Sequence, residues 1–174
     1  QCDERANFLS QFVDVRRIGE FNAGHSVRTT NIPLDKLSAD FDKLDPRETL
    51  VIVSPGNLED MVKYPQACKA RGIDYIFDPG QSLPMLAAKD LVQSLEGCRI
   101  LIANDYELDL ILGKTGMDKE ALLKRAAAVI VTLGDLGSRL FTPGCEICIP
   151  AAKPKTVKDP TGAGDSYRGG LISG

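Results

Sequence analysis

Short apolar runs alternate with segments of helical period from Leu50 onward, and this alternation is the strongest constraint on the fold. Apolar runs of strand length occur at 50–54, 73–77, 99–103 and 128–133. Continuous apolar runs of this kind are typical of strands buried on both faces of a parallel sheet. Helical patterns fill the intervals, at 58–71, 83–95, 104–112 and 119–127. The sequence therefore predicts an α/β fold with a mainly parallel central sheet and helices on both faces.

Prolines and glycines predict where these helices end. Pro65 lies inside the first helical pattern, where it lacks a backbone N–H and is expected to kink or interrupt the helix. Gly72 and Gly113 are each expected to cap the helix before them, because glycine tolerates positive φ. Gly113 also opens Gly-Lys-Thr, which looks like the end of a Walker A loop, but Leu108 stands where that loop needs a glycine.

The pattern changes at both ends of this alternating region. Runs at 138–142 and 145–149, separated by Pro-Gly, predict an antiparallel hairpin. We interpret the C-x-x-C pair in the second run as part of that strand rather than as a metal or redox site. Residues 1–49 show no sustained period, apart from a short helix expected around 34–41.

Size and charge exclude several classes of function. The chain has 174 residues, which fits one domain of ordinary size. Its net charge of −3 provides no basic field for nucleic acid or an anionic membrane surface, and no apolar run is long enough to span a membrane. Five cysteines, an odd number, and an N-terminus without the apolar core of a signal peptide predict reduced thiols in the cytoplasm.

The segment from Asp159 to Gly170 places small residues before an acid, where a helix is expected to begin. Gly162, Ala163 and Gly164 allow backbone N–H groups to approach an anion, and a helix start favours a phosphate there. Asp165, in the first turn, would be placed to accept a proton from a hydroxyl. The alternative interpretation is an ordinary helix start with a favourable acid. Together these residues point to phosphoryl transfer.

This segment resembles the second signature of the PfkB carbohydrate kinases, the ribokinase-like family that includes adenosine kinases. Upstream, Asn104-Asp105-Tyr106-Glu107 resembles the family's N-x-x-E motif, and Val131-Thr132-Leu133-Gly134 resembles its nucleotide-contacting strand end. The resemblance implies a ribokinase-like fold and ATP-dependent phosphorylation of a hydroxymethyl group on a sugar or nucleoside. Asp78-Pro79-Gly80-Gln81 and Tyr-Arg-Gly-Gly are similar to adenosine-kinase-like bacterial members.

The resemblance also implies catalytic roles for residues of the segment from Asp159 to Gly170. Gly162, Ala163 and Gly164 would form an anion hole for the γ-phosphate of ATP. Asp165 would be the base that activates the acceptor hydroxyl. Such a reaction depends on alignment and charge neutralisation more than on covalent chemistry.

Nucleotide and metal roles follow from the other matched motifs. Asn104 and Glu107 would organise Mg²⁺ with its waters and the phosphates, although the same spacing also makes a capping box. By the same resemblance, Thr132 and Gly134 would line the nucleotide; a plain strand end and tight turn is the alternative. The resemblance also implies that Asp159 and Thr161, just before the anion hole, help to hold K⁺. The alternative is that they only stabilise a turn.

The resemblance covers 50–174 well and 1–49 poorly. A complete member of the family is longer, and no Gly-Gly precedes Gly169 to match its N-terminal signature. We therefore expect a poorly assigned segment, 1–49, as a candidate remnant of the lid or substrate side, and a catalytic core, 50–174, truncated at its C-terminus. The expected partners are a small sugar or nucleoside and a second copy of the chain.

Two alternatives remain open at this point. One is a non-catalytic nucleotide-binding fragment or relic of the same fold. The other is an unrelated Rossmann-type binding domain, which has little support because no G-x-G-x-x-G follows a strand.

Overall fold

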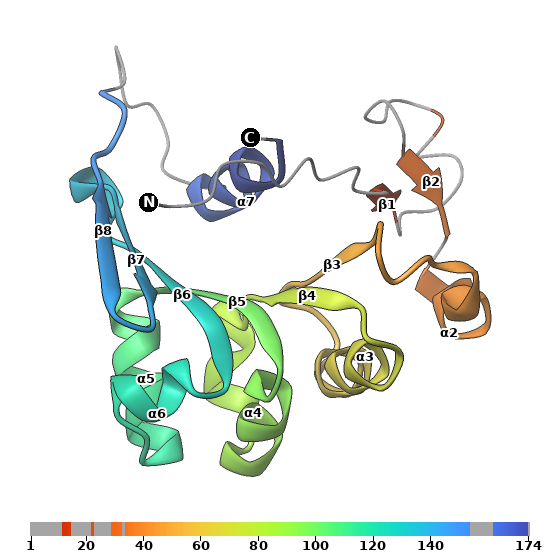
Figure 1. Cartoon of the computed structure of the whole chain (residues 1–174), viewed down its shortest axis with the longest axis horizontal. Coiled ribbons are helices and arrows are strands. Elements are labelled where there is room, and N and C mark those ends of the chain that lie inside the picture. The colour runs from red at the N-terminus through yellow and green to blue at the C-terminus, as the bar shows by residue number, and fades with distance from the viewer. Residues whose placement is uncertain (1–11, 15–21, 23–28, 33, 154–161, 174) are drawn as a thin grey trace.

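A six-stranded sheet forms the centre of the computed structural model, which describes residues 12–14, 22, 29–32, 34–153 and 162–173 (Figure 1). Its strands lie side by side in chain order, with each strand next to the one before it. The first four are parallel and the last two run antiparallel, as the predicted hairpin requires. The strands are β3 Leu50–Val53, β4 Asp74–Phe77, β5 Cys98–Asn104, β6 Ala126–Thr132, β7 Ser138–Thr142 and β8 Cys145–Ile149.

Helices cover the two faces of this sheet unequally. One face carries α3 Leu58–Arg71, α4 Ala88–Leu95, α5 Asp105–Thr115 and α6 Lys119–Leu123, and the other carries α7 Ala163–Ser173 (Figure 1). Successive parallel strands that are neighbours, joined by crossovers of one hand, place all their helices on the same face. This arrangement confirms the predicted α/β fold with a mainly parallel sheet.

Two apolar clusters hold these layers together. The larger lies between the sheet and α3–α6 and includes fully buried residues such as Phe77, Leu101 and Ile111. The smaller lies on the opposite face, where the isoleucines of β4, β5 and β6 pack with Tyr167 and Leu171 of α7. Burial on both faces explains why these strands have continuous apolar runs.

The described part of the N-terminal region packs beside the β3 edge of the sheet (Figure 1). It contains β1 Phe12–Asp14 and β2 Thr29–Asn31, which pair in parallel, and then α2 Leu34–Asp40 and the 3₁₀ helix η1 Phe41–Lys43. The short helix expected around 34–41 is present. Four apolar side chains from this region join the larger cluster, namely Ile32, Leu37, Phe41 and Leu44.

Pro65 does not interrupt its helix, so that part of the prediction was wrong. α3 runs continuously from Leu58 to Arg71, with Asn57 as its N-cap, and Pro65 is buried on its inner side. The burial of the proline ring in the core offsets the hydrogen bond that the missing N–H cannot make. Gly72 ends the helix with a φ of 66°, as expected.

Gly113 does not cap its helix, and this prediction was also wrong. α5 continues to Thr115 and ends at Gly116, whose φ is 67° and whose N–H donates to the carbonyl of Leu112. The extra turn is held by Lys114, whose Nζ donates at 2.7–2.9 Å to three carbonyl oxygens of the segment before α4, those of Leu83, Pro84 and Leu86.

Two further boundaries differ from the predictions. Residues 80–85 form the 3₁₀ helix η2 Gly80–Met85, so the helix expected from Leu83 begins only at Ala88. Ala126 and Ala127 belong to β6 rather than to the preceding helix, because Ala126 pairs with Cys98 of β5. Tertiary pairing here outweighs the helical propensity of alanine. Within the described ranges, no helix is long and apolar enough to cross a membrane.

Candidate active site

A pocket of about 620 Å³ lies where β4, β5 and β6 end, opposite the start of α7. The carboxyl ends of parallel strands are the usual place for ligands in such sheets. Six of the predicted site residues line it, namely Asn104, Glu107, Thr132, Gly162, Gly164 and Asp165. Two others, Ala163 and Gly134, are close in sequence to lining residues but do not line it themselves. The pocket thus brings together three motifs that are far apart in the chain.

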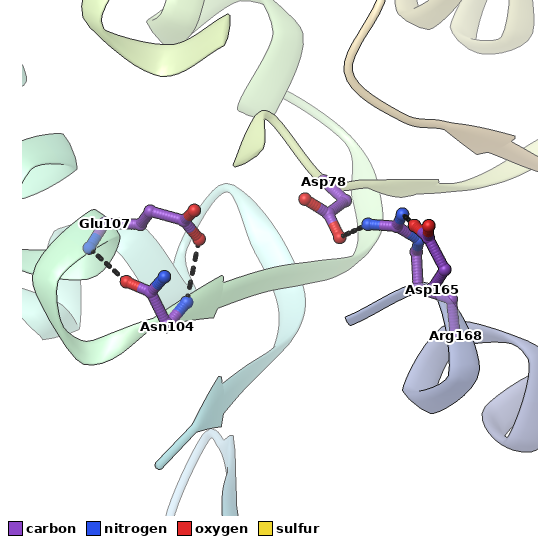
Figure 2. A network of polar contacts seen from close by, with 5 residues as sticks. All are labelled: Asp78, Asn104, Glu107, Asp165 and Arg168. Carbon is purple, nitrogen blue, oxygen red and sulfur yellow. Dashed lines mark hydrogen bonds and ion pairs between the residues drawn. The ribbon is translucent and has the colours of Figure 1, made fainter. Parts of the chain in front are cut away.

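Asn104 and Glu107 form a capping box at the start of α5 (Figure 2). The Glu107 backbone N–H donates to Asn104 Oδ1 at 2.7 Å, and the Asn104 N–H donates to Glu107 Oε2 at 2.9 Å. These bonds hold both side chains in one orientation at the edge of the pocket. A carboxylate keeps acceptor capacity on its second oxygen, so the capping role is compatible with a ligand role.

The start of α7 forms the opposite wall of the pocket. Gly162 has a φ of 78°, which favours glycine, and its carbonyl accepts from the Ser166 N–H at 2.9 Å. A Cβ added at Gly162 or Gly164 would meet no other part of the described chain within 4 Å, so no described side chain fills the space beside the backbone there. The first amides of a helix lack partners inside it. Asp165 lies in this first turn, exposed.

Arg168 and Asp78 belong to the site, although neither was among the predicted site residues. The guanidinium of Arg168 donates through Nη1 to Asp78 Oδ2 and through Nη2 to Asp165 Oδ1 (Figure 2). The side chains of Arg168 and Asp78 are 16% and 8% exposed, whereas that of Asp165 is 75% exposed. In the sequence, Arg168 and Asp78 both lie in motifs that resemble adenosine-kinase-like members, and Asp165 and Arg168 are three residues apart on one expected helix.

A second contact ties α7 to the sheet on its other side. The Tyr167 hydroxyl donates to Oγ of the buried Ser138 at 2.9 Å, where β7 begins. Its ring packs against the smaller apolar cluster. Side chains 167 and 168 therefore attach the helix to β7 and to the end of β4, on either side of the pocket.

Thr132 reaches the pocket because it ends β6 between two paired neighbours, Asn104 of β5 and Ser138 of β7. Gly134 begins the 3₁₀ helix η3 Gly134–Leu136 with a φ of 60°. Gly137 closes this turn: its carbonyl accepts from the Leu133 N–H at 2.8 Å. The turn therefore sets the position at which β6 ends.

The predicted metal ligands are placed only in part. Asp159 and Thr161 lie outside the described residues. Among the residues that are described, no group of three or more histidine, cysteine, aspartate or glutamate side chains could hold a metal ion. Mg²⁺ in kinase sites is commonly held by one or two carboxylates, waters and substrate phosphates. Glu107 lines the pocket and has the carboxylate chemistry for that role.

Comparison with known proteins agrees with these motifs. A nucleoside kinase of Methanocaldococcus jannaschii is 38% identical over 125 residues, which make up 71% of this chain and 41% of that protein. The chain thus spans about two fifths of the length of this curated relative. The structure of Burkholderia thailandensis nucleoside kinase in complex with inosine is 37% identical, with a TM-score of 0.69, over 71% of this chain and 41% of that chain.

The fold and the family follow from two further matches. The crystal structure of the M. jannaschii nucleoside kinase, described as an archaeal member of the ribokinase family, has a TM-score of 0.68 and 31% identity over 83% of this chain and 52% of that chain. This confirms the ribokinase-like fold and removes the alternative of an unrelated Rossmann domain. The sequence model of the family described as "pfkB family carbohydrate kinase" matches residues 4–174, and the chain therefore belongs to the pfkB family of carbohydrate kinases.

Proposed function

We propose that the protein is an ATP-dependent kinase that phosphorylates a hydroxymethyl group of a nucleoside or a sugar. One observation carries the proposal: an exposed carboxylate, Asp165, lines the same pocket as the open backbone of Gly162 and Gly164 and the capping box of α5. A carboxylate that can act as a base, backbone N–H groups at a helix start and a second carboxylate across the pocket are among the groups that serve phosphoryl transfer.

Each residue has a separate task in this reaction. Asp165 accepts the proton of the acceptor hydroxyl while the oxygen of that hydroxyl forms the new bond to phosphorus. Backbone N–H groups at 162–164 donate to the oxygens of the transferring phosphoryl group. Asn104 and Glu107 would hold Mg²⁺ at the phosphates, and Thr132 with Gly134 would line the nucleotide. ATP would supply the phosphoryl group and leave as ADP when the bond between its γ-phosphorus and the bridging oxygen breaks, and Mg²⁺ held there would neutralise charge on the phosphates.

A nucleoside is the acceptor that we propose first. The M. jannaschii and B. thailandensis proteins are named nucleoside kinases, and the second was solved with inosine. We further propose that Asp159 and Thr161 help to hold K⁺, that residues 1–49 contribute to the acceptor side, and that the protein forms a homodimer. The described cysteines are free thiols, which supports a cytoplasmic location.

The test is ADP formation with Mg²⁺ and K⁺ by the protein at its natural length, offered adenosine, inosine, cytidine, ribose or fructose. Asp165→Asn should lower kcat by about 10²–10⁴-fold because it removes the base. Asp109→Asn is the matched control: the same chemical change on the exposed side of α5 should leave kcat within about twofold.

The outcomes separate this function from the second candidate. The second candidate is nucleotide binding without turnover, by a non-catalytic relic of the same fold. Turnover on one acceptor that is lost in Asp165→Asn would support the kinase. ATP binding with no turnover on any acceptor would support the non-catalytic alternative.

A further inference from the structure

The guanidinium of Arg168 lies between two carboxylates with very different surroundings (Figure 2). Asp78, at the end of β4, is buried, whereas Asp165, on the first turn of α7, is largely exposed. Arg168 donates to Asp78 through Nη1 and to Asp165 through Nη2. The three side chains form a chain that runs from the interior of the sheet to the open side of the pocket.

The inner end of this chain is fixed by packing. The backbone N–H of Asp78 donates to the Val53 carbonyl at 2.9 Å, which ties the end of β4 to β3. A Cβ added at Gly80 would lie 2.5 Å from Pro55 Cγ and 3.2 Å from Asp78 Oδ1, so this turn is closely packed around the carboxylate. A buried carboxylate strongly requires a partner of opposite charge, and Arg168 is that partner.

The outer end gains its orientation from Arg168. An exposed ion pair three residues apart on a helix contributes little by itself, because ordering two long side chains costs entropy. Here Arg168 is already ordered by Asp78, and its planar fork directs the remaining donors. Holding Asp165 therefore requires only the ordering of one short side chain.

We propose that Arg168, anchored by Asp78, is a positioning residue that orients the Asp165 carboxylate for proton transfer. This rests on the proposed kinase function, because it assigns Asp165 as the base. Arg168 acts through Asp165, and Asp78 acts through Arg168. Displacement of a base by about 1 Å can lower the rate about 10²-fold, so loss of this support should lower the rate of the chemical step more than it lowers the affinity for ATP.

The first test separates kcat from KM in Arg168→Gln. We expect kcat to fall about 10–100-fold, while the KM for ATP stays within about twofold. Arg168→Lys should restore only part of the loss, because an ammonium cannot bridge two carboxylates with a planar fork. Asp78→Asn should lower kcat in the wild-type background but have little further effect in Arg168→Gln, since both act through one chain.

Ser138→Ala is the matched control, because Ser138 holds α7 through Tyr167 on the other side of the pocket. It weakens the docking of the helix without touching the Arg168 chain, and kcat should stay within about twofold. If Ser138→Ala lowers kcat as much as Arg168→Gln, Arg168 only docks the helix and the proposal is overturned. An additive effect of Asp78→Asn in the Arg168→Gln background would also overturn it.

A structural measurement keeps this proposal separate from the proposed function. In a crystal structure of Arg168→Gln, α7 should remain docked through Tyr167 while the Asp165 carboxylate changes rotamer or becomes spread over several. An unchanged Asp165 in that variant would refute the positioning role. Wild-type protein that is inactive on every acceptor would refute the kinase function, whichever way the Asp165 measurement falls.

Discussion

Replacement of Gly137 by alanine should destabilise the β7–β8 hairpin far more than replacement of Gly144, the glycine in the turn between these two strands, by alanine. Gly137 has φ 93° and ψ −132° and lies where η3 leads into β7. A Cβ added there would lie 2.1 Å from the Ile149 carbonyl oxygen and 2.6 Å from the Ala151 nitrogen. Both are backbone atoms, so no side-chain rotation can relieve the clash.

The expected loss follows from two contributions. Forcing alanine into this region of φ and ψ costs about 1–3 kcal/mol, and moving packed backbone apart costs about the same again. The free energy of unfolding should therefore fall by about 4 kcal/mol, and the melting temperature by about 10 °C for a chain of this length. The KM for ATP should rise as well, because the same turn sets where β6 ends.

Gly144→Ala is the matched control for urea and thermal unfolding. Gly144 also has positive φ, 79°, but an added Cβ would lie more than 4 Å from every neighbouring group in the described part of the chain. It should cost only the left-handed backbone term, about 1 kcal/mol. If Gly137→Ala loses no more stability than Gly144→Ala, the close approach of the β8 end is not a constraint, and the reasoning is wrong.

Two further predictions concern buried polar groups. Tyr75→Phe should lower the free energy of unfolding, measured by urea titration, by about 1–2 kcal/mol. The reason is that the buried hydroxyl donates to the carbonyls of Ser94 and Glu96, at 2.9 and 3.1 Å. A loss under about 0.3 kcal/mol would contradict this prediction. Burial raises the pKa of the Cys68 and Cys98 thiols to about 12, so the unfolded chain releases these protons first and stability should fall as pH rises from about 8.5 towards 12. Unfolding measured between pH 7 and 10.5 should show that decline, and at pH 8 an alkylating reagent should modify the exposed cysteines of β8 well before these two.

The sheet could be predicted because its strands are buried on both faces and therefore stand out as continuous apolar runs. The errors arose where tertiary contacts outweigh local signals. Pro65 stays in α3 because its ring is buried, and α5 passes Gly113 because Lys114 binds carbonyls about 30 residues away. Such contacts have no signature in a window of ten residues.

The site shows the same division. Asn104, Glu107 and Asp165 line one pocket and stood out in the sequence because each belongs to a motif that is contiguous in the chain; their roles stay predictions. The link between Arg168 and Asp78 could not, because it joins residues 90 positions apart and depends on where α7 docks. From the sequence, Arg168 could equally have faced solvent, substrate or phosphate.

The strand order has a consequence for synthesis on the ribosome. Each central strand pairs with the one made just before it, so β3 to β8 can assemble in the order in which they emerge, through contacts of modest sequence separation. The helix that bears Asp165 is made after all of them and closes onto Asp78, whose strand was finished long before. Until that late contact forms, a nascent chain whose strands β3 to β8 have paired lacks the wall of the pocket that the start of α7 provides.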